Sequence, residues 1–417
     1  MKSFLKILSI VLTIIGLQLY FGTTITATNT NNVVTWRGPL ADGIYNEKNL
    51  LESWPANGPE LLWCDTTAGI GYTTPVVVNN KIYSCGMIDS TGYLMCYSID
   101  GKKMWQKPFG TEYTATSYQG ARGNLKYDEG SFYYLTGIEQ AVKIDAETGK
   151  VLWLVDLTKE FNAPAPKFGA CEMPIIQGNE VVFTPGTTTS MAVFDKTSGK
   201  LIRKSPARGD IPGYSSAILV NHNGRKIWFN HTKENLYAVD YVTADTLFTI
   251  KHPAKNTDNS NSPSYFNATG ELFITQFSDF GAKMITLAKD GSSYTVKWEN
   301  LLFDVKIGGY IVYNGNIYGP SNGKKRWMCI ELASGETKYS VRDFPFGCMV
   351  MADNLLYCYS ELGDMAIIKP TPEKFDIVSQ FKAFEGTKQF THPLIANGRM
   401  ILRYQNTIKV YNISKPK

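Results

Sequence analysis

The sequence predicts an all-β fold, an eight-bladed β-propeller with four-stranded blades, and three observations support this prediction. Short apolar runs recur in a unit of about 45 residues along almost the whole chain. Each unit opens on an apolar run that ends in a turn rich in Asn, Asp or Gly. Tryptophans recur on the last run of several units, at Trp105, Trp153 and Trp298. A period of this length with several strands per unit is typical of a propeller.

Residues 1–27 are predicted to be a signal peptide. Lys2 and Lys6 precede a mostly apolar run, and Ala27 suits the last position before cleavage. The alternative is an uncleaved anchor, but the uninterrupted apolar stretch is shorter than the roughly 20 residues that cross a bilayer. We therefore expect a secreted protein, periplasmic or extracellular at the cell surface, with no stable membrane span after cleavage.

Residues 60–417 are predicted to form the propeller, and residues 28–59 an N-terminal strap before it. A turn signal follows each opening strand, and in three units it is Asn-Gly, at Asn223, Asn314 and Asn397. Asn-Gly between β-runs is the strongest short hairpin signal. The eight opening strands start near Pro75, Leu125, Pro174, Ala217, Pro263, Tyr310, Met349 and Pro393. The runner-up count is seven blades.

The third and fourth strands of each unit follow a second pattern. A third strand often ends in an acidic residue, as at Asp145 and Asp195, and a Gly-Lys turn then leads into the fourth strand. The tryptophans of the fourth strands are expected to pack between neighbouring blades, because a large ring on a sheet face buries well.

The two ends of the repeat region complement each other. The last unit has only three strands, the third being Thr407–Tyr411, whereas Glu60–Trp63 is a fourth-strand segment without a blade of its own. We therefore predict that the N-terminal strand closes the last blade, which removes an exposed sheet edge.

The repeat resembles the pyrroloquinoline-quinone-like repeat family. Val142–Asp145, followed by Thr148-Gly149 and Trp153, matches the family's repeat, and Trp36-Arg-Gly-Pro39 looks like the leader of its secreted bacterial members. The resemblance covers roughly residues 36–413 and implies the propeller fold. It also implies two kinds of function. Quinoprotein dehydrogenases of the family hold a quinone and a calcium ion in the propeller mouth, whereas a periplasmic scaffold branch helps to assemble outer-membrane proteins and binds no quinone.

The residues just before each first strand should surround the central funnel. From different blades they include Tyr72, Arg122, Glu172, Tyr214, Asn261, Tyr310 and His392. Tyrosines with an Arg and a His would suit a sugar, a peptide or an anionic group, so these seven residues are the ligand-binding candidates. The alternative is that they only satisfy one another, for example through an ion pair between Arg122 and Glu172 on adjacent blades.

This set does not favour catalysis. Calcium takes 6–8 oxygen ligands, several of them carboxylates, but the set contains one acid, Glu172, and no Trp or adjacent Cys pair. The four histidines lack metal-ligand spacing. His222 and His231 flank the hairpin at Asn223 and are expected to be exposed strand residues. No nucleophile-elbow, Walker or dinucleotide-binding motif occurs. We predict no catalytic residue and no metal ligand, with PQQ and calcium as the alternative cofactors.

Charge argues against a nucleic-acid partner, and the cysteine count limits the possible disulfides. The formal net charge of +5 falls to +3 without the two signal lysines, and no basic stripe for nucleic acid is present. Seven cysteines leave at least one unpaired within the chain. Cys85 and Cys96 could form a hairpin disulfide or remain buried thiols.

The leading hypothesis is a monomeric, non-catalytic binding or scaffold protein with a protein or carbohydrate partner. A quinone- and calcium-dependent oxidoreductase acting on alcohols or sugars is the alternative.

Overall fold

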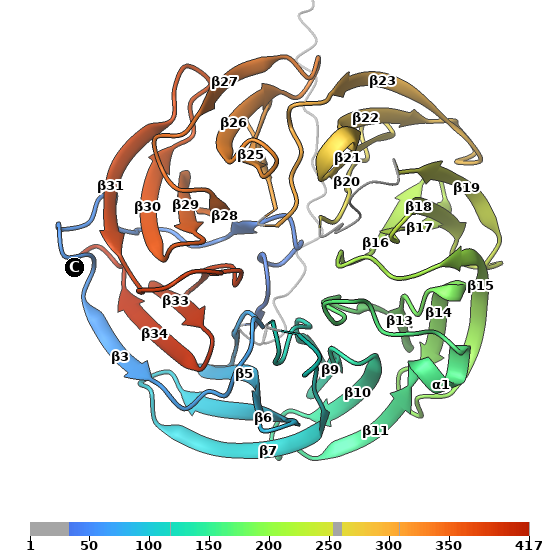
Figure 1. Cartoon of the computed structure of the whole chain (residues 1–417), viewed down its shortest axis with the longest axis horizontal. Coiled ribbons are helices and arrows are strands. Elements are labelled where there is room, and N and C mark those ends of the chain that lie inside the picture. Colours follow the sequence, from blue (N-terminus) through green and yellow to red (C-terminus); the bar gives the residue numbers. More distant parts are fainter. Residues whose placement is uncertain (1–32, 117, 253–260, 308, 417) are drawn as a thin grey trace, which may run out of the picture. The chain divides into compact units, whose positions relative to one another are not determined.

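The computed structural model describes residues 33–116, 118–252, 261–307 and 309–416, so the predicted signal peptide lies outside the described residues. These residues belong to one unit, Asn32–Lys417. Within it, eight sheets follow one another around a ring (Figure 1). The predicted eight-bladed propeller is confirmed, and the runner-up count of seven blades is wrong.

The strands follow the chain blade by blade, from the innermost strand outward. Blade 1 has β4 (Val76–Val78), β5 (Lys81–Ile88), β6 (Thr91–Ser98) and β7 (Lys103–Thr111). Blade 2 has β8 (Lys126–Asp128), β9 (Ser131–Leu135), β10 (Gln140–Asp145) and β11 (Val151–Asp156). Blade 3 has β12 (Ile175–Gln177), β13 (Glu180–Phe183), β14 (Thr187–Asp195) and β15 (Leu201–Asp210). Blade 4 has β16 (Ile218–His222), β17 (Arg225–His231), β18 (Asn235–Asp240) and β19 (Thr246–Lys251).

The second half of the ring repeats this order. Blade 5 has β20 (Ser264–Phe266), β21 (Glu271–Gln276), β22 (Gly281–Leu287) and β23 (Tyr294–Asn300). Blade 6 has β24 (Ile311–Tyr313), β25 (Asn316–Ser321), β26 (Arg326–Glu331) and β27 (Thr337–Val341). Blade 7 has β28 (Gly347–Ala352), β29 (Leu355–Ser360), β30 (Asp364–Lys369) and β31 (Asp376–Lys382). Blade 8 has β32 (Leu394–Ala396), β33 (Arg399–Tyr404), β34 (Thr407–Asn412) and β3 (Leu61–Asp65). A short helix, α1 (Leu157–Phe161), follows β11, and a 3-10 turn, η1 (Ser278–Phe280), precedes β22. None of the helices in the described ranges is long and apolar enough to cross a membrane.

The turn residues explain where the inner strands end. At the β24–β25 hairpin, Asn314 and Gly315 have φ of 46° and 73°. Two successive positive φ values match the right-handed twist of the flanking strands, and Asn-Gly adopts them at little cost. The predicted Asn-Gly hairpins are therefore confirmed as the connections between first and second strands.

Tryptophans of the fourth strands join neighbouring blades, as predicted. Trp153 on β11 of blade 2 lies against Gly199 of blade 3, and its indole N–H donates to the Lys196 carbonyl at 3.1 Å. Trp298 of blade 5 is held in the same way by the Leu332 carbonyl of blade 6, at 3.0 Å. A glycine in the turn before each receiving strand leaves room for the ring.

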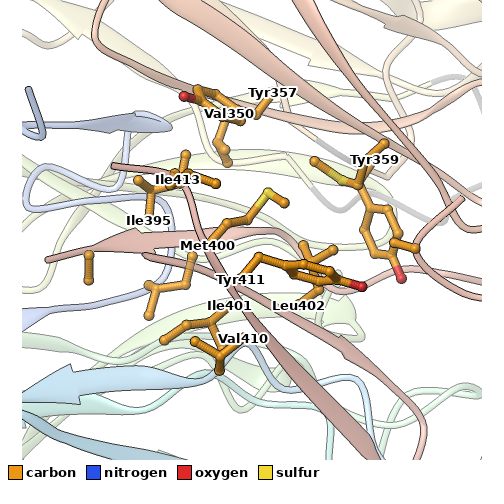
Figure 2. Packing of buried hydrophobic residues seen from close by; sticks show 14 of the residues in the cluster. Val350, Tyr357, Tyr359, Ile395, Met400, Ile401, Leu402, Val410, Tyr411 and Ile413 are labelled. Atoms are coloured by element: carbon orange, nitrogen blue, oxygen red, sulfur yellow. The ribbon is translucent and has the colours of Figure 1, made fainter. Parts of the chain in front are cut away.

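The ring closes through strand β3. It pairs antiparallel with β34, with Cys64 opposite Lys409 (Figure 1), and completes the last blade as predicted. Trp63 on β3 then donates to the Ile99 carbonyl of blade 1 at 3.1 Å, which extends the tryptophan contact across the closure. Blades 7 and 8 pack through a large apolar cluster that includes Val350, Met400 and Val410 (Figure 2).

The first part of the segment before β3, residues 33–45, lies inside the ring, and the chain then reaches the outer strand of blade 7 at Trp54. Its strand β1 (Val33–Val34) pairs with the innermost strand of blade 1, and β2 (Ile44–Tyr45) pairs in parallel with the innermost strand of blade 7. Blades 1 and 7 therefore carry a short fifth strand in addition to the predicted four. The Arg37 guanidinium donates to the Tyr310 carbonyl at 2.7 Å, which ties this segment to blade 6 as well.

The structure decides between the alternatives for the cysteine pair and corrects the expectation for two histidines. Cys85 lies opposite Leu94 and Cys96 opposite Tyr83, so the two thiols do not face each other, and all seven cysteines are free. The expectation of exposed histidines is wrong, because His222 is 3% exposed and His231 is 0% exposed. The two histidines do not contact each other across the hairpin. Nδ1 of His222 is 2.8 Å from the Tyr265 hydroxyl, and Nδ1 of His231 is 3.0 Å from Nε2 of His252.

Candidate functional site

A cavity of about 200 Å³ lies among the segments that lead into the innermost strands. We call it the mouth cavity. The segments converge there because the innermost strand of each blade lies nearest the ring centre. The lining residues are Trp36, Tyr72, Thr74, Tyr118, Arg122, Asn124, Phe168, Cys171, Tyr214, Ser216, Lys306, Ile307, Phe390 and His392.

Five aromatic side chains form a continuous arc along the cavity. Ring centroids are 5.7 Å apart for Tyr72 and Phe390 and 6.0 Å for Phe390 and Tyr118. The arc continues at 5.6 Å to Phe168 and a further 6.2 Å to Tyr214. These separations fall in the range of favourable aromatic pairs. All five rings are half-buried, so part of each remains open to a ligand.

Trp36 contributes a sixth ring to the cavity from the segment inside the ring. Its indole N–H donates to Nδ1 of His392 at 3.1 Å, and the two rings meet edge to face. Because Nδ1 accepts this bond, neutral His392 carries its proton on Nε2. Both residues are less than 9% exposed, so Trp36 and His392 form a fixed part of the lining.

Cations lie on the aromatic rings of the arc. The Arg122 guanidinium is 5.1 Å from the Tyr72 centroid, and Nζ of Lys388 is 4.3 Å from that of Tyr118. Nζ of Lys167 is 5.2 Å from the centroid of Phe168. The ring faces attract these cations electrostatically. Arg122 also donates from Nη1 to the Tyr118 carbonyl at 2.5 Å, whereas its buried Nε has no hydrogen-bond partner among the described residues.

The structure brings four of the seven predicted residues together in this cavity: Tyr72, Arg122, Tyr214 and His392. Asn261 and Tyr310 line a smaller neighbouring cavity instead, which shares His392. Tyr310 is 4% exposed and its hydroxyl donates to the Ser262 carbonyl at 2.9 Å. Asn261 donates to the Val305 carbonyl at 2.6 Å. These two side chains hold loops together at the ring centre.

Glu172 lies away from the mouth cavity. It is 6% exposed and lines a small cavity formed by blades 2, 3 and 4. Its Oε1 accepts from the Thr184 backbone N–H at 3.1 Å, and burial raises its pKa to about 8. The suggested ion pair with Arg122 is wrong, because Glu172 turns toward its own blade, where the Thr184 backbone N–H just after β13 is its donor. The carboxyl group that interacts electrostatically with Arg122 is that of Glu112, outside the cavity lining.

Several cavity residues were missed by the sequence interpretation. Tyr118 and Phe168 lie four residues before Arg122 and Glu172, and Phe390 lies two before His392. An aromatic residue shortly before each rim position was the available signal. Trp36 could not be placed, because nothing in the sequence shows that the N-terminal segment lies within the ring.

A quinone site with calcium does not fit these residues. Calcium binds 6–8 oxygens, usually with several carboxylates. The mouth cavity is lined by two basic side chains, Arg122 and Lys306, and by no carboxylate among the described residues. The one predicted acid, Glu172, is buried elsewhere with a raised pKa, so it is largely neutral at pH 7.

The repeat, the closed ring and the inner N-terminal segment define a propeller of the PQQ-like repeat class. A family model described as "Outer membrane protein assembly factor BamB" matches residues 90–341, which is more than half of the chain. The chain therefore belongs to this family, PQQ_2. No curated protein matches the sequence.

Solved structures share the fold at low sequence identity. BamB from Moraxella catarrhalis is 13% identical with a TM-score of 0.57, over 79% of this chain and 96% of that one. The computationally designed Ika8 protein is 11% identical with a TM-score of 0.60, over 85% and 100%. A europium-containing methanol dehydrogenase is 10% identical with a TM-score of 0.53, over 88% and 89%. At these identities the similarity shows the fold alone.

Proposed function

We propose that this chain is a non-catalytic binding or scaffold protein whose partner, a protein or a carbohydrate, occupies the mouth cavity. The observation that supports this most directly is the lining: an arc of five aromatic rings with cations on their faces and no carboxylate among the described residues. Such a surface offers stacking and charge, but no paired acid and base for chemistry.

The arc is suited to binding because it is held in place before a ligand arrives. Arg122 donates to the Tyr118 carbonyl, and the Tyr214 hydroxyl accepts from the Phe168 backbone N–H at 3.2 Å. Rings fixed in this way lose little conformational entropy on binding. The volume of about 200 Å³ is below the roughly 300–1,000 Å³ of sites for drug-sized ligands, so one ring or side chain fits inside.

The proposed location follows from the sequence of residues 1–27, whose basic start and apolar run are those of a secretory signal. We propose a monomer that is secreted to the periplasm or the cell surface. The quinone- and calcium-dependent oxidoreductase remains the competing hypothesis from the family resemblance, and the absence of carboxylates from the described lining weighs against it.

Two cysteines allow the proposed site to be tested directly. Cys171 lines the mouth cavity and is partly exposed, Cys64 is exposed on β3 of blade 8, and the other five cysteines are buried. The rate at which a small alkylating reagent modifies Cys171 is measured in a Cys64→Ser variant, and the rate at Cys64 in a matched Cys171→Ser variant. Both rates are measured with and without each member of a panel of oligosaccharides and short peptides.

We expect at least one class of probe to slow the alkylation of Cys171 saturably and to leave the alkylation of Cys64 unchanged. If calorimetry instead detects binding of a probe that does not protect Cys171, the ligand site lies outside the mouth cavity and the proposal is wrong.

A further inference from the structure

We infer that the ligand of the mouth cavity is an anionic sugar, a pyranose ring that carries a carboxylate or a sulfate. This inference rests on the proposed function and specifies its ligand. It follows from the charge around the cavity, from the Arg122 Nε–H donor that has no partner among the described residues, and from the shape of the aromatic arc.

Several cations elsewhere in the propeller are neutralised by ion pairs. Lys196 pairs with Asp128 and Glu129, and Arg203 pairs with Glu180. By contrast, in the described part of the chain no carboxylate forms an ion pair with Arg122, Lys167 or Lys388, which lie on aromatic rings. Cations gathered around a concave, partly apolar site focus a positive potential into it and attract an anion.

Arg122 provides the most specific contact for such an anion. Its side chain lines the cavity, where one nitrogen is bonded to the Tyr118 carbonyl and the guanidinium also interacts with the Cys171 thiol, while the buried Nε has no partner among the described residues. A buried donor without a partner is costly, and an anionic oxygen would satisfy it. The planar guanidinium matches the paired oxygens of a carboxylate or sulfate.

The remaining lining suits a sugar ring. The negative faces of the aromatic rings attract the C–H groups on the flat side of a pyranose. Thr74, Asn124 and Ser216 add short polar groups beside the rings. A volume of about 200 Å³ holds roughly one such ring.

A peptide is less well served by the same site. One way in which an extended peptide binds is by adding a strand to a free sheet edge. At blades 1 and 7 the innermost edges are already paired with β1 and β2. The mouth cavity itself is lined by aromatic and polar side chains, which a compact anionic ring uses better than an extended backbone.

The inference is tested by calorimetric titration of the mature protein with matched oligosaccharides. Glucuronate- and galacturonate-containing oligosaccharides and their sulfated counterparts are compared with neutral oligosaccharides of the same linkage. We expect the acidic sugars to bind at least tenfold more tightly than the neutral ones, since a charge-assisted hydrogen bond to Arg122 is lost in the latter. The separate carboxylate and sulfate arms identify which anion is preferred.

Three variants locate the effect. Lys388→Gln removes a cation that lies over Tyr118, a ring of the cavity lining, and Lys143→Gln is its matched control, because Lys143 lies over Tyr133, at 5.5 Å, which is not part of that lining. Arg122→Lys keeps the charge and removes the planar fork. Lys388→Gln and Arg122→Lys should each weaken acidic sugars several-fold, with Lys143→Gln unchanged and all three melting near the wild type.

Each other outcome overturns the inference in a distinguishable way. Equal binding of acidic and neutral sugars, with Cys171 protected from alkylation by both, refutes the anionic ligand but leaves the mouth as a binding site. Binding of acidic peptides in place of sugars has the same consequence. Acidic sugars that bind equally to wild type, Lys388→Gln and Arg122→Lys bind elsewhere, and the proposed function is then refuted together with the inference.

Discussion

Replacing Gly199 with alanine should destabilise the propeller by placing a methyl group between blades 2 and 3. Gly199 has φ of +70°, and a Cβ built there would lie 2.9 Å from Cδ2 and 3.0 Å from Cγ of the Trp153 ring. Gly315 is a matched control, because its φ is +73° and a Cβ there would meet nothing within 4 Å. Both substitutions force alanine into the left-handed region, and only one of them also displaces a tryptophan.

The two costs can be separated. Left-handed backbone costs alanine roughly 1–2 kcal/mol at either position. At Gly199 the Trp153 ring must also move, which costs roughly 0.5–1.5 kcal/mol in rotamer strain and a similar amount in the lost bond to the Lys196 carbonyl. We therefore expect a loss of unfolding free energy of about 2–5 kcal/mol for Gly199→Ala and about 1–2 kcal/mol for Gly315→Ala.

Equilibrium urea denaturation followed by circular dichroism measures both losses. The test is completed in a Trp153→Ala background, where the two glycine substitutions should cost the same because no ring is left to displace. Equal losses of stability for the two substitutions in the wild-type background would refute the argument that tryptophan–glycine contacts join the blades.

Further predictions concern pH and ring closure. Burial raises the pKa of Glu172 to about 8, so the folded state binds the extra proton and the free energy of unfolding falls as pH rises from about 4.5 to 8. The free energy of unfolding of Glu172→Gln, relative to wild type, should therefore rise by roughly 1.4 kcal/mol per pH unit in this window. Urea midpoints at pH 5 and 8 measure this difference, and a variant no more stable than wild type at pH 8 would contradict the prediction. Burial lowers the pKa of His252 to about 4, so the unfolded state binds more protons and the free energy of unfolding falls as pH drops from about 6.5 to 4. His252→Gln should lose less stability over this pH range than wild type does. An unchanged dependence of stability on pH would exclude His252 as its source. Trp63→Ala should lower the free energy of unfolding, measured by urea denaturation, by roughly 2–4 kcal/mol, because the ring stacks on Tyr97 and donates a hydrogen bond to blade 1 across the closure. A loss below about 1 kcal/mol would mean that ring closure does not depend on this contact.

The sequence was informative wherever local chemistry decides the structure. Asn314-Gly315 needs two positive φ values, and only a few residue types adopt them readily, so the hairpin could be read directly. Trp105 and Trp153 likewise recur at the same place in successive repeats, which is why their packing between blades could be predicted, whereas the glycine that receives each ring was not. The three-stranded last unit and the extra strand near Trp63 predicted the closure for the same reason.

The site was less predictable because it depends on where side chains point. Glu172 precedes a first strand just as Tyr214 does, yet its carboxylate turns to the Thr184 backbone while Tyr214 lines the cavity. Position along the chain does not determine this direction. Trp36 reaches the cavity only because β1 and β2 carry their segment through the ring, a long-range pairing that no local pattern encodes.

The most direct test of the account is a thermal-shift titration that compares the two kinds of ligand in one protein. The chain without residues 1–27 is titrated with uronic-acid oligosaccharides, and separately with pyrroloquinoline quinone with and without calcium. A ligand that binds only the native state raises the melting temperature as its concentration passes the dissociation constant. We predict a saturable rise with the acidic sugars that Lys388→Gln reduces, and no rise with the quinone and calcium. A saturable, calcium-dependent rise with the quinone that Glu172→Gln abolishes would contradict the account and support the oxidoreductase.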